Sequence, residues 1–215
     1  MPLKYQNNIL KNKLENWEYI LWDNESISKF LKKQNINMYK KYCNYKYLHQ
    51  KVDFAKYCIL YYLGGFAVDM DSFIIKDPLE IITKYPNYQV YISLVNLYYY
   101  ESFIINRTLQ FYNNASILAY PKSNLMLNLI NDCPSNYKYN FNKIFVIQNT
   151  TGPTIFTKIA NISNNVKILS CNYFEPCLYS NCTINDNTYV IHLQDQTWIN
   201  PLIKKVVEVY YEFIN

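Results

Sequence analysis

Two aspartates separated by a single residue, Asp69 and Asp71, are the residues of this sequence best suited to chemistry. They follow the apolar run of residues 66–68, which predicts a short strand that delivers both carboxylates at its end. Alternate side chains of a strand share a face, so the two carboxylates are expected to point the same way. Such a pair repels unless a cation lies between them, and oxygen ligands suit Mg²⁺ or Mn²⁺ bound to a phosphorylated ligand. The alternative interpretation is two exposed aspartates on a turn.

An amphipathic helix is expected immediately before this motif. Apolar residues recur at spacings of three and four over residues 47–63. On this helix Asp53 and Lys56 share a face, either within a binding site or as a surface ion pair. Two of the three glycines of the chain, Gly64 and Gly65, come next, and the first is expected in the left-handed conformation that ends a helix. The segment therefore predicts a helix, a glycine turn, a strand and a carboxylate pair, in that order.

Strands and helices are expected to alternate along the rest of the chain, which indicates one α/β domain covering residues 1–215. Strands are predicted over residues 17–22, 73–75, 88–95, 116–119, 145–147, 166–169 and 189–193. Helices are predicted after residues 23–26, over residues 79–82, around residues 125–130, from residue 153 with Thr151 as its cap, and from residue 201. No element is predicted for the polar stretch rich in Tyr and Lys that follows the first helix.

The composition argues against several classes of protein. Tyrosine supplies 24 residues and Arg107 is the only arginine, a bias typical of an A/T-rich genome, viral genomes included. The net charge of +5 comes with scattered lysines, which disfavours nucleic-acid binding but suits an anionic nucleotide-sugar ligand. No apolar run approaches the roughly 20 residues of a membrane span. The N-terminus does not resemble a signal peptide, so a soluble cytoplasmic protein, with homo-oligomers allowed, is expected.

The six cysteines contain no Cys-x-x-Cys pair and no histidine at a recognisable spacing, so a thiol nucleophile is not expected. Reduced thiols are expected in a cytoplasmic protein. Cys171, Cys177 and Cys182 are nevertheless near enough in sequence to allow one disulfide.

Several ordered segments resemble the DXD-containing sugar-transferase family. The main match comprises residues 53–57 (Asp-Phe-Ala-Lys-Tyr), 60–65 (Leu-Tyr-Tyr-Leu-Gly-Gly) and 68–71 (Val-Asp-Met-Asp). Further matches lie at residues 17–23, 113–122, 151–153 and 190–198. The family includes fungal initiating mannosyltransferases, bacterial capsule and lipopolysaccharide transferases and, more distantly, the glucosylating domains of large clostridial toxins.

This resemblance implies a GT-A-type, Rossmann-like α/β domain with a mixed central sheet. It also implies a glycosyltransferase that uses Mn²⁺ or Mg²⁺ to move a sugar from a UDP- or GDP-sugar to a carbohydrate, protein or lipid acceptor, with retention. The chain departs from the family at Lys56, where a point charge replaces the bidentate fork of Arg. Residues 1–14 lack the family's opening strand, which lines the nucleotide base, so the N-terminal strand is expected to be shortened or missing.

The resemblance also implies roles for individual residues. Asp69 and Asp71 would be the catalytic pair, with Asp71 the main metal ligand and Asp69 in contact with the metal shell and the donor. His192 would be a third ligand of the metal or of a phosphate. Asp53 and Lys56 would bind donor-sugar hydroxyls or the diphosphate. The further substrate-binding positions are Gly65, Asn114, Thr151, Gly152, Thr197 and Trp198, the last two as donors to the diphosphate.

Two other functions compete with this interpretation. A degenerate, non-catalytic sugar-nucleotide-binding protein of the same fold would also account for the missing N-terminal strand. An aspartate-nucleophile phosphatase uses Asp-x-Asp at a strand end, but here Ser72 and Phe73 follow the motif and no Asp-Asp pair lies downstream. Without the resemblance, His192 would more simply be a hydrogen-bonded strand-end histidine and Trp198 a core aromatic.

Overall fold

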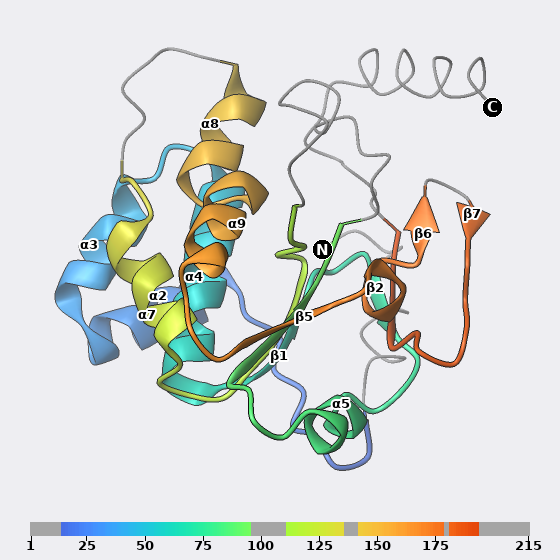
Figure 1. Cartoon of the computed structure of the whole chain (residues 1–215). Helices are drawn as coiled ribbons and strands as arrows, with labels where there is room; N and C mark the ends of the chain where they lie inside the picture. Colours follow the sequence, from blue (N-terminus) through green and yellow to red (C-terminus); the bar gives the residue numbers. More distant parts are fainter. Residues whose placement is uncertain (1–13, 96–110, 136–141, 179–180, 194–215) are drawn as a thin grey trace.

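A mixed four-stranded sheet forms the centre of the computed structural model, which describes residues 14–95, 111–135, 142–178 and 181–193 (Figure 1). The strand order is β1 (Gly65–Val68), β4 (Ser116–Ala119), β3 (Val90–Ser93) and β5 (Val166–Leu169). β4 runs antiparallel to both β1 and β3, whereas β3 and β5 are parallel. The expectation of an α/β fold with a mixed sheet is therefore confirmed.

Helices cover one face of this sheet, and shorter elements cover the other (Figure 1). The helical face carries α2 (Asn24–Gln34), α3 (Ile36–Asn44), α4 (Leu48–Leu63), α7 (Asn124–Asp132), α8 (Lys143–Thr150) and α9 (Pro153–Asn161). The opposite face carries α5 (Leu79–Lys84), the β2 (Ser72–Ile74) and β8 (Val190–His192) ribbon, η1 (Cys171–Tyr173), and the hairpin of β6 (Cys177–Leu178) and β7 (Asn181–Cys182). Among the described residues, no helix has the length and apolarity needed to cross a membrane.

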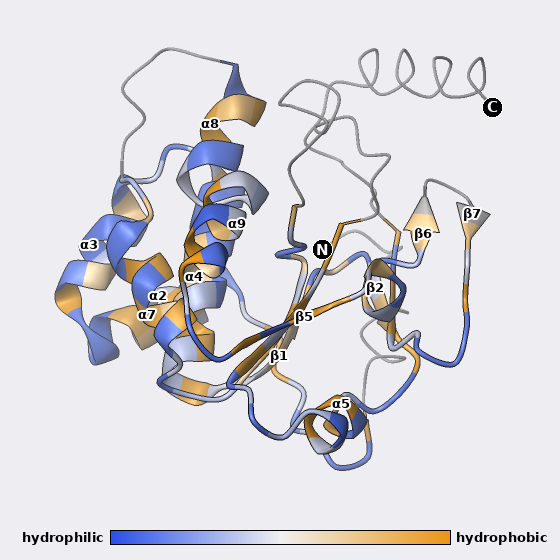
Figure 2. Ribbon diagram, viewed as in Figure 1, coloured by the Kyte–Doolittle hydropathy of each residue, from blue (hydrophilic) through white to orange (hydrophobic). Residues whose placement is uncertain are grey.

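The alternation of side chains along the strands creates two apolar cores. Ile92 and Ile117 face the helices and pack with Phe54 of α4. Their sequence neighbours Tyr91 and Leu118 face the other way and pack with the elements of the opposite face. Because successive strand residues point to opposite faces, strands buried on both sides are largely apolar, as the mainly apolar colouring of the sheet in Figure 2 shows.

Helix α4 carries two of the polar residues singled out above and ends at the glycine pair. Its bounds match the predicted helix closely. Gly64 has φ 68° and ψ −159°, so φ is positive as expected, but the residue is not in the left-handed helical conformation. The turn brings Gly64 against Pro121, and its amide donates to the carbonyl of Leu60 at 2.9 Å. This turn directs the chain from α4 into β1.

Replacing Gly64 with alanine is expected to lower the free energy of unfolding by about 2–4 kcal/mol. A Cβ at Gly64 would lie 2.7 Å from Cδ of Pro121 and 3.0 Å from the carbonyl oxygen of Ala119, in addition to the cost of positive φ. Gly65→Ala is the matched control, because Gly65 also has positive φ but its Cβ would meet no atom within 4 Å. Urea denaturation of both variants measures the difference, and equal losses would contradict the steric explanation.

Several elements differ from the sequence predictions. Residues 17–22 form no strand; Trp17 instead donates its indole N–H to Asp77 at 3.0 Å. The polar stretch after α2 forms helix α3, whose N-terminus is capped by the side chain of Asn35. Residues 145–147 belong to helix α8 and not to a strand, because Asn142 caps the helix and α8 packs on α4 and α9. Tertiary packing here outweighs the β-propensity of Phe, Val and Ile.

The remaining predicted elements are present, with boundary shifts of a few residues. Gly152, and not Thr151, is the N-cap of α9, and Thr151 is the C-cap of α8. A disulfide joins Cys177 to Cys182 across the β6–β7 hairpin, so the expectation of reduced thiols is wrong for this pair. The other cysteines, Cys43, Cys58, Cys133 and Cys171, are free thiols. The helix predicted from residue 201 and the opening segment before residue 14 lie outside the described residues.

Candidate active site

The Asp-x-Asp motif forms a tight turn between β1 and β2. Asp69 directly follows β1, and its amide donates to the carbonyl of Ala115 at 2.9 Å. The amide of Ser72 then donates to the carbonyl of Asp69 at 3.0 Å, which closes the turn. The strand predicted over residues 66–68 is confirmed as β1, which ends at Val68, and the aspartates follow its end as expected. The argument from alternating strand side chains does not apply to them, because they lie on the turn. The turn nevertheless brings the two carboxylates together, and in this respect the prediction holds.

His192 comes to the aspartates from β8, more than 100 residues later in the chain. β8 pairs with β2, and His192 lies opposite Ser72, next to Asp71. Nε2 of His192 lies 3.3 Å from Oδ1 of Asp71. One potential ligand atom from each of Asp69, Asp71 and His192 lies within 4.8 Å of the others. The β2–β8 ribbon thus assembles the predicted triad.

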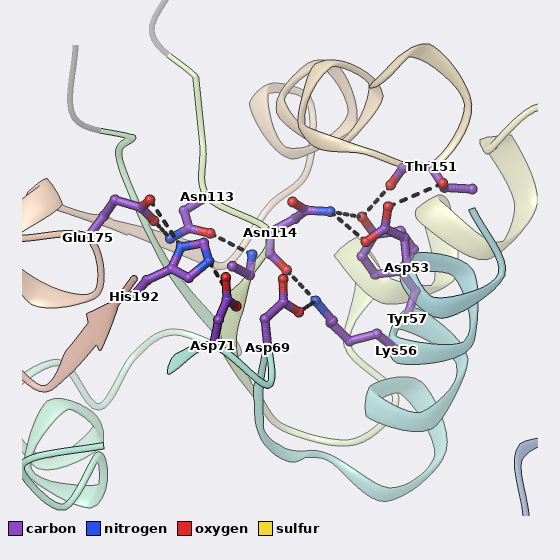
Figure 3. A network of polar contacts seen from close by, with 11 residues as sticks. Asp53, Lys56, Tyr57, Asp69, Asp71, Asn113, Asn114, Thr151, Glu175 and His192 are labelled. Carbon is purple, nitrogen blue, oxygen red and sulfur yellow. Dashed lines mark hydrogen bonds and ion pairs between the residues drawn. The ribbon is translucent and has the colours of Figure 1, made fainter. Parts of the chain in front are cut away.

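Carboxylates flank the imidazole of His192 on both sides (Figure 3). Nδ1 faces Oε1 of Glu175 at 3.1 Å, while Nε2 faces Asp71. Burial lowers the pKa of His192, but Glu175 and Asp71 outweigh it and hold the pKa well above its usual value. In the absence of a metal, the imidazole is therefore the positive partner of two acids.

Lys56 of α4 holds the other aspartate of the motif. Its ammonium lies 2.5 Å from Oδ1 of Asp69 and donates to the carbonyl of Asn114 at 2.8 Å. The side chain is only 8% exposed. Burial lowers the pKa of Lys56, but Asp69 and Asp53 outweigh it and raise the pKa above its usual value. The lysine is thus a fixed positive charge beside the motif, and not the surface partner considered from the sequence.

Asp53 lies one turn before Lys56 on α4, within a second group of polar side chains (Figure 3). Its Oδ1 accepts from the Asn114 amide at 3.1 Å, and its Oδ2 accepts from the Thr151 hydroxyl at 3.3 Å. Tyr57 joins the group by accepting from Asn114 at 3.1 Å and donating to the carbonyl of Thr151 at 2.6 Å. Burial raises the pKa of Asp53 to about 7, although Lys56 acts in the opposite direction.

Replacing Asp53 with asparagine is expected to stabilise the protein more at pH 8 than at pH 4.5. A carboxyl whose folded-state pKa is raised from 3.8 to about 7 stabilises the fold below pH 4, and this contribution disappears as the pH rises to 7. Asparagine does not titrate, so the free energy of unfolding of the variant, relative to that of the wild type, should increase by about 1–4 kcal/mol between pH 4.5 and pH 8. Urea denaturation of both proteins at several pH values measures it, and a pH-independent difference would contradict the raised pKa.

The structure brings together most of the residues that the sequence singled out. One network contains Asp53, Lys56, Asp69, Asp71, Asn114, Thr151 and His192 (Figure 3). Gly65 lies at the start of β1, the end away from Asp69, and is not part of this network. Gly152 adjoins the network through Thr151, and a Cβ there would lie 3.0 Å from the backbone of Ile147 and Gln148, which indicates a packing role. Thr197 and Trp198 lie outside the described residues.

Sequence reasoning missed three members of the site: Tyr57, Asn113 and Glu175. Tyr57 is part of the quoted Asp-Phe-Ala-Lys-Tyr segment but received no role. Asn113 adjoins Asn114 and could have been considered with it. Glu175 lies between Phe174 and Pro176, and an acidic residue in an apolar context is the signal that could have marked it.

The donor atoms of the triad fit a divalent cation. Two carboxylates supply oxygen ligands and His192 supplies a nitrogen, a combination found at Mn²⁺ and other first-row metal sites. The side chains of Asp71 and His192 are only 16% and 12% exposed, whereas that of Asp69 is 35% exposed. The site therefore combines partly buried ligands with an open side through which a substrate could complete the coordination.

A family model described as "Glycosyltransferase sugar-binding region containing DXD motif" matches residues 3–88 of the chain. This span contains Asp53, Lys56 and both aspartates of the turn. This match and the relatives described below support a place for the chain in the DXD-containing sugar-transferase family. It is accordingly a glycosyltransferase, and its Asp69-Met70-Asp71 turn is the motif of the family. Asn114, Thr151 and His192 lie beyond the matched span and are joined to it by the fold.

Two relatives resemble this chain, one over almost its whole length and one over a short segment. A protein of Acanthamoeba polyphaga mimivirus, described as an uncharacterized glycosyltransferase, is 29% identical over 216 residues, which cover 97% of this chain and 80% of the relative. An inositol phosphoceramide mannosyltransferase of Schizosaccharomyces pombe is 38% identical over 55 residues, 26% of this chain and 17% of the relative. The similarity to the mimivirus protein covers almost the whole chain, and therefore includes nearly all of the residues of the site.

Proposed function

We propose that this sugar transferase has the GT-A architecture, forms one domain and depends on a divalent cation, Mn²⁺ or Mg²⁺. The donor is a UDP- or GDP-sugar, the acceptor is a carbohydrate, protein or lipid, and the transfer proceeds with retention. The observation that carries the proposal is the convergence of Asp69, Asp71 and His192 within 4.8 Å, beside the buried cation Lys56. The family resemblance supports the donor class and the retention.

In the proposed reaction, the bond between the anomeric carbon and the diphosphate oxygen breaks, a bond to the acceptor oxygen forms, and the proton of the acceptor hydroxyl passes to the leaving diphosphate. Asp69, Asp71 and His192 would hold a divalent cation, which would stabilise the negative charge that develops on the leaving diphosphate. Lys56 orients Asp69 through the 2.5 Å contact between its ammonium and Oδ1 of Asp69, and it adds a fixed positive charge beside the proposed metal site. Thr197 and Trp198 are proposed as additional donors to the diphosphate.

The group around Asp53 is proposed to bind the donor sugar. Asp53, Asn114 and Thr151 present carboxylate, amide and hydroxyl groups within hydrogen-bond reach of one another. Sugar hydroxyls donate and accept, so they can exchange partners with such a group without leaving a buried polar atom unpaired. Lys56 lies between this group and the metal triad, as expected where the sugar joins the diphosphate. Gly65 and Gly152 are retained as substrate-binding proposals on the resemblance alone.

Release of nucleoside diphosphate tests the proposed function. The protein is incubated with UDP- and GDP-sugars, with Mn²⁺, Mg²⁺ or a chelator, and with water or simple glycosides as acceptors. Release of UDP or GDP that requires the cation is the expected result. Cation-dependent donor binding without turnover would favour the non-catalytic alternative, and neither binding nor turnover for any donor would overturn the proposal.

A further inference from the structure

Glu175 is a buried carboxylate that lies beside His192, at the ring nitrogen that does not face Asp71 (Figure 3). Its side chain is only 2% exposed. Oε1 lies 3.1 Å from Nδ1 of His192, and Oε2 accepts a hydrogen bond from the side-chain amide of Asn113. Burying a carboxylate is costly unless its oxygens find donors, so both contacts compensate for its removal from water.

When a cation binds and His192 gives up one proton, the position of Glu175 favours the imidazole that keeps its proton on Nδ1. A carboxylate oxygen can only accept, so a neutral imidazole facing Glu175 is favourable when Nδ1 carries the proton. Nε2, which lies 3.3 Å from Asp71 on the other side, then has its lone pair free toward the triad. With a cation held by Asp69, Asp71 and His192, the Nε2 lone pair would face the cation, whereas the opposite tautomer would set the Nδ1 lone pair against the carboxylate of Glu175, which is repulsive.

Glu175 is also connected to the Asp-x-Asp turn through the chain that precedes β4. Oδ1 of Asn113 accepts from the amide of Ala115 at 2.5 Å, and the carbonyl of Ala115 accepts from the amide of Asp69 at 2.9 Å. Three consecutive hydrogen bonds therefore lead from Glu175 to the backbone of the first aspartate. The same carboxylate thus orients His192 and is linked to the turn that carries the other two proposed ligands.

We propose that Glu175 is a positioning residue that holds His192 with its proton on Nδ1 and presents Nε2 to the cation. The inference rests on the metal site of the proposed function. Hydrogen bonds of this kind from a carboxylate to a metal-ligating histidine fix the ring and raise its basicity. His192 and Asn113 each need an acceptor oxygen at this position. A carboxylate supplies two acceptor oxygens, whereas a side-chain amide supplies only one, so the position needs a carboxylate.

Glu175→Gln is expected to weaken Mn²⁺ binding by about 10–100-fold, as measured by calorimetry on the full chain. The glutamine can satisfy His192 or Asn113, but its NH₂ group then faces a second donor. Adding Asn113→Asp restores the pattern, because the glutamine amide can donate to the new carboxylate, which still accepts from the amide of Ala115. The double variant should bind Mn²⁺ within about threefold of the wild type, by the logic of coupled neighbours. Asn113→Asp alone should weaken binding, since two carboxylates would face each other.

Glu80→Gln is the matched control. Glu80 is an exposed carboxylate that accepts from the hydroxyl of Tyr189 at 3.0 Å, outside the triad. Its amide variant should leave Mn²⁺ affinity unchanged. Equal affinity of Glu175→Gln and wild type, or failure of the double variant to recover, would overturn the positioning role while leaving the proposed function intact. A wild-type protein that binds neither Mn²⁺ nor Mg²⁺ would overturn both.

A measurement on the unaltered protein covers the case in which the variants fail to fold. The chain has only two histidines, so ¹⁵N-histidine labelling gives spectra of two rings, which His49→Gln assigns. With Zn²⁺ as a diamagnetic probe, His192 should keep its proton on Nδ1 and bind the metal through Nε2. Coordination through Nδ1, or no change at His192 with bound Zn²⁺, would overturn the inference.

Discussion

Replacing Asp71 with asparagine is expected to reduce cation-dependent release of nucleoside diphosphate by about 10²–10³-fold. Asp71 has a side chain that is only 16% exposed and faces Nε2 of His192 across 3.3 Å. Asparagine has nearly the same shape but lacks the charge that attracts a divalent ion, so the loss should come from weaker metal binding and weaker stabilisation of the leaving diphosphate. Turnover measured over a series of Mn²⁺ concentrations separates these two contributions.

Asp186→Asn is the control for this substitution. Asp186 is exposed on the loop before β8 and is not part of the triad. Its substitution removes the same negative charge as Asp71→Asn. It should keep wild-type turnover and wild-type Mn²⁺ dependence. Retention of turnover by Asp71→Asn at every Mn²⁺ concentration would remove Asp71 from the proposed mechanism.

Lys56→Met is expected to lower the free energy of unfolding by about 2–4 kcal/mol and to abolish donor turnover. The substitution keeps the length of the apolar stem but leaves Asp69 without its 2.5 Å partner and the carbonyl of Asn114 without its donor. The partial exposure of Asp69, 35%, allows water to compensate in part, which keeps the loss below that of a fully buried pair. Urea denaturation and the diphosphate assay measure the two effects.

Two further substitutions sharpen the Lys56 experiment. Lys29→Met removes an ammonium 2.7 Å from Glu25, but both side chains are about three-quarters exposed, so stability should change by less than about 0.5 kcal/mol. Lys56→Arg keeps the charge and supplies the bidentate fork of a guanidinium, so it should retain activity. Equal effects of Lys56→Met and Lys29→Met would contradict the structural role of the buried pair.

The helix, glycine turn and strand around the motif could be predicted because their signals are local. The three- and four-residue spacing on α4 and the glycine pair that ends it are properties of consecutive residues. For the same reason, the start of α2 and the strand β4 were predicted at or near their observed bounds. In contrast, the run Phe145-Val146-Ile147 favours a strand locally, and only its packing against α4 and α9 makes it helical.

By itself, the sequence determined which residue types were present for the chemistry: the two aspartates, Asp53 with Lys56 on one helical face, and His192 as one of only two histidines. The tertiary structure alone decided that the aspartates lie on a turn, that β8 brings His192 to them, and that Glu175 and Asn113 lie behind the site. The physical reason is that residue spacing describes neighbours along one element. Contacts between α4, the β1–β2 turn, the start of β4 and β8 depend on the pairing of strands that lie far apart in the sequence, β1 with β4 and β2 with β8.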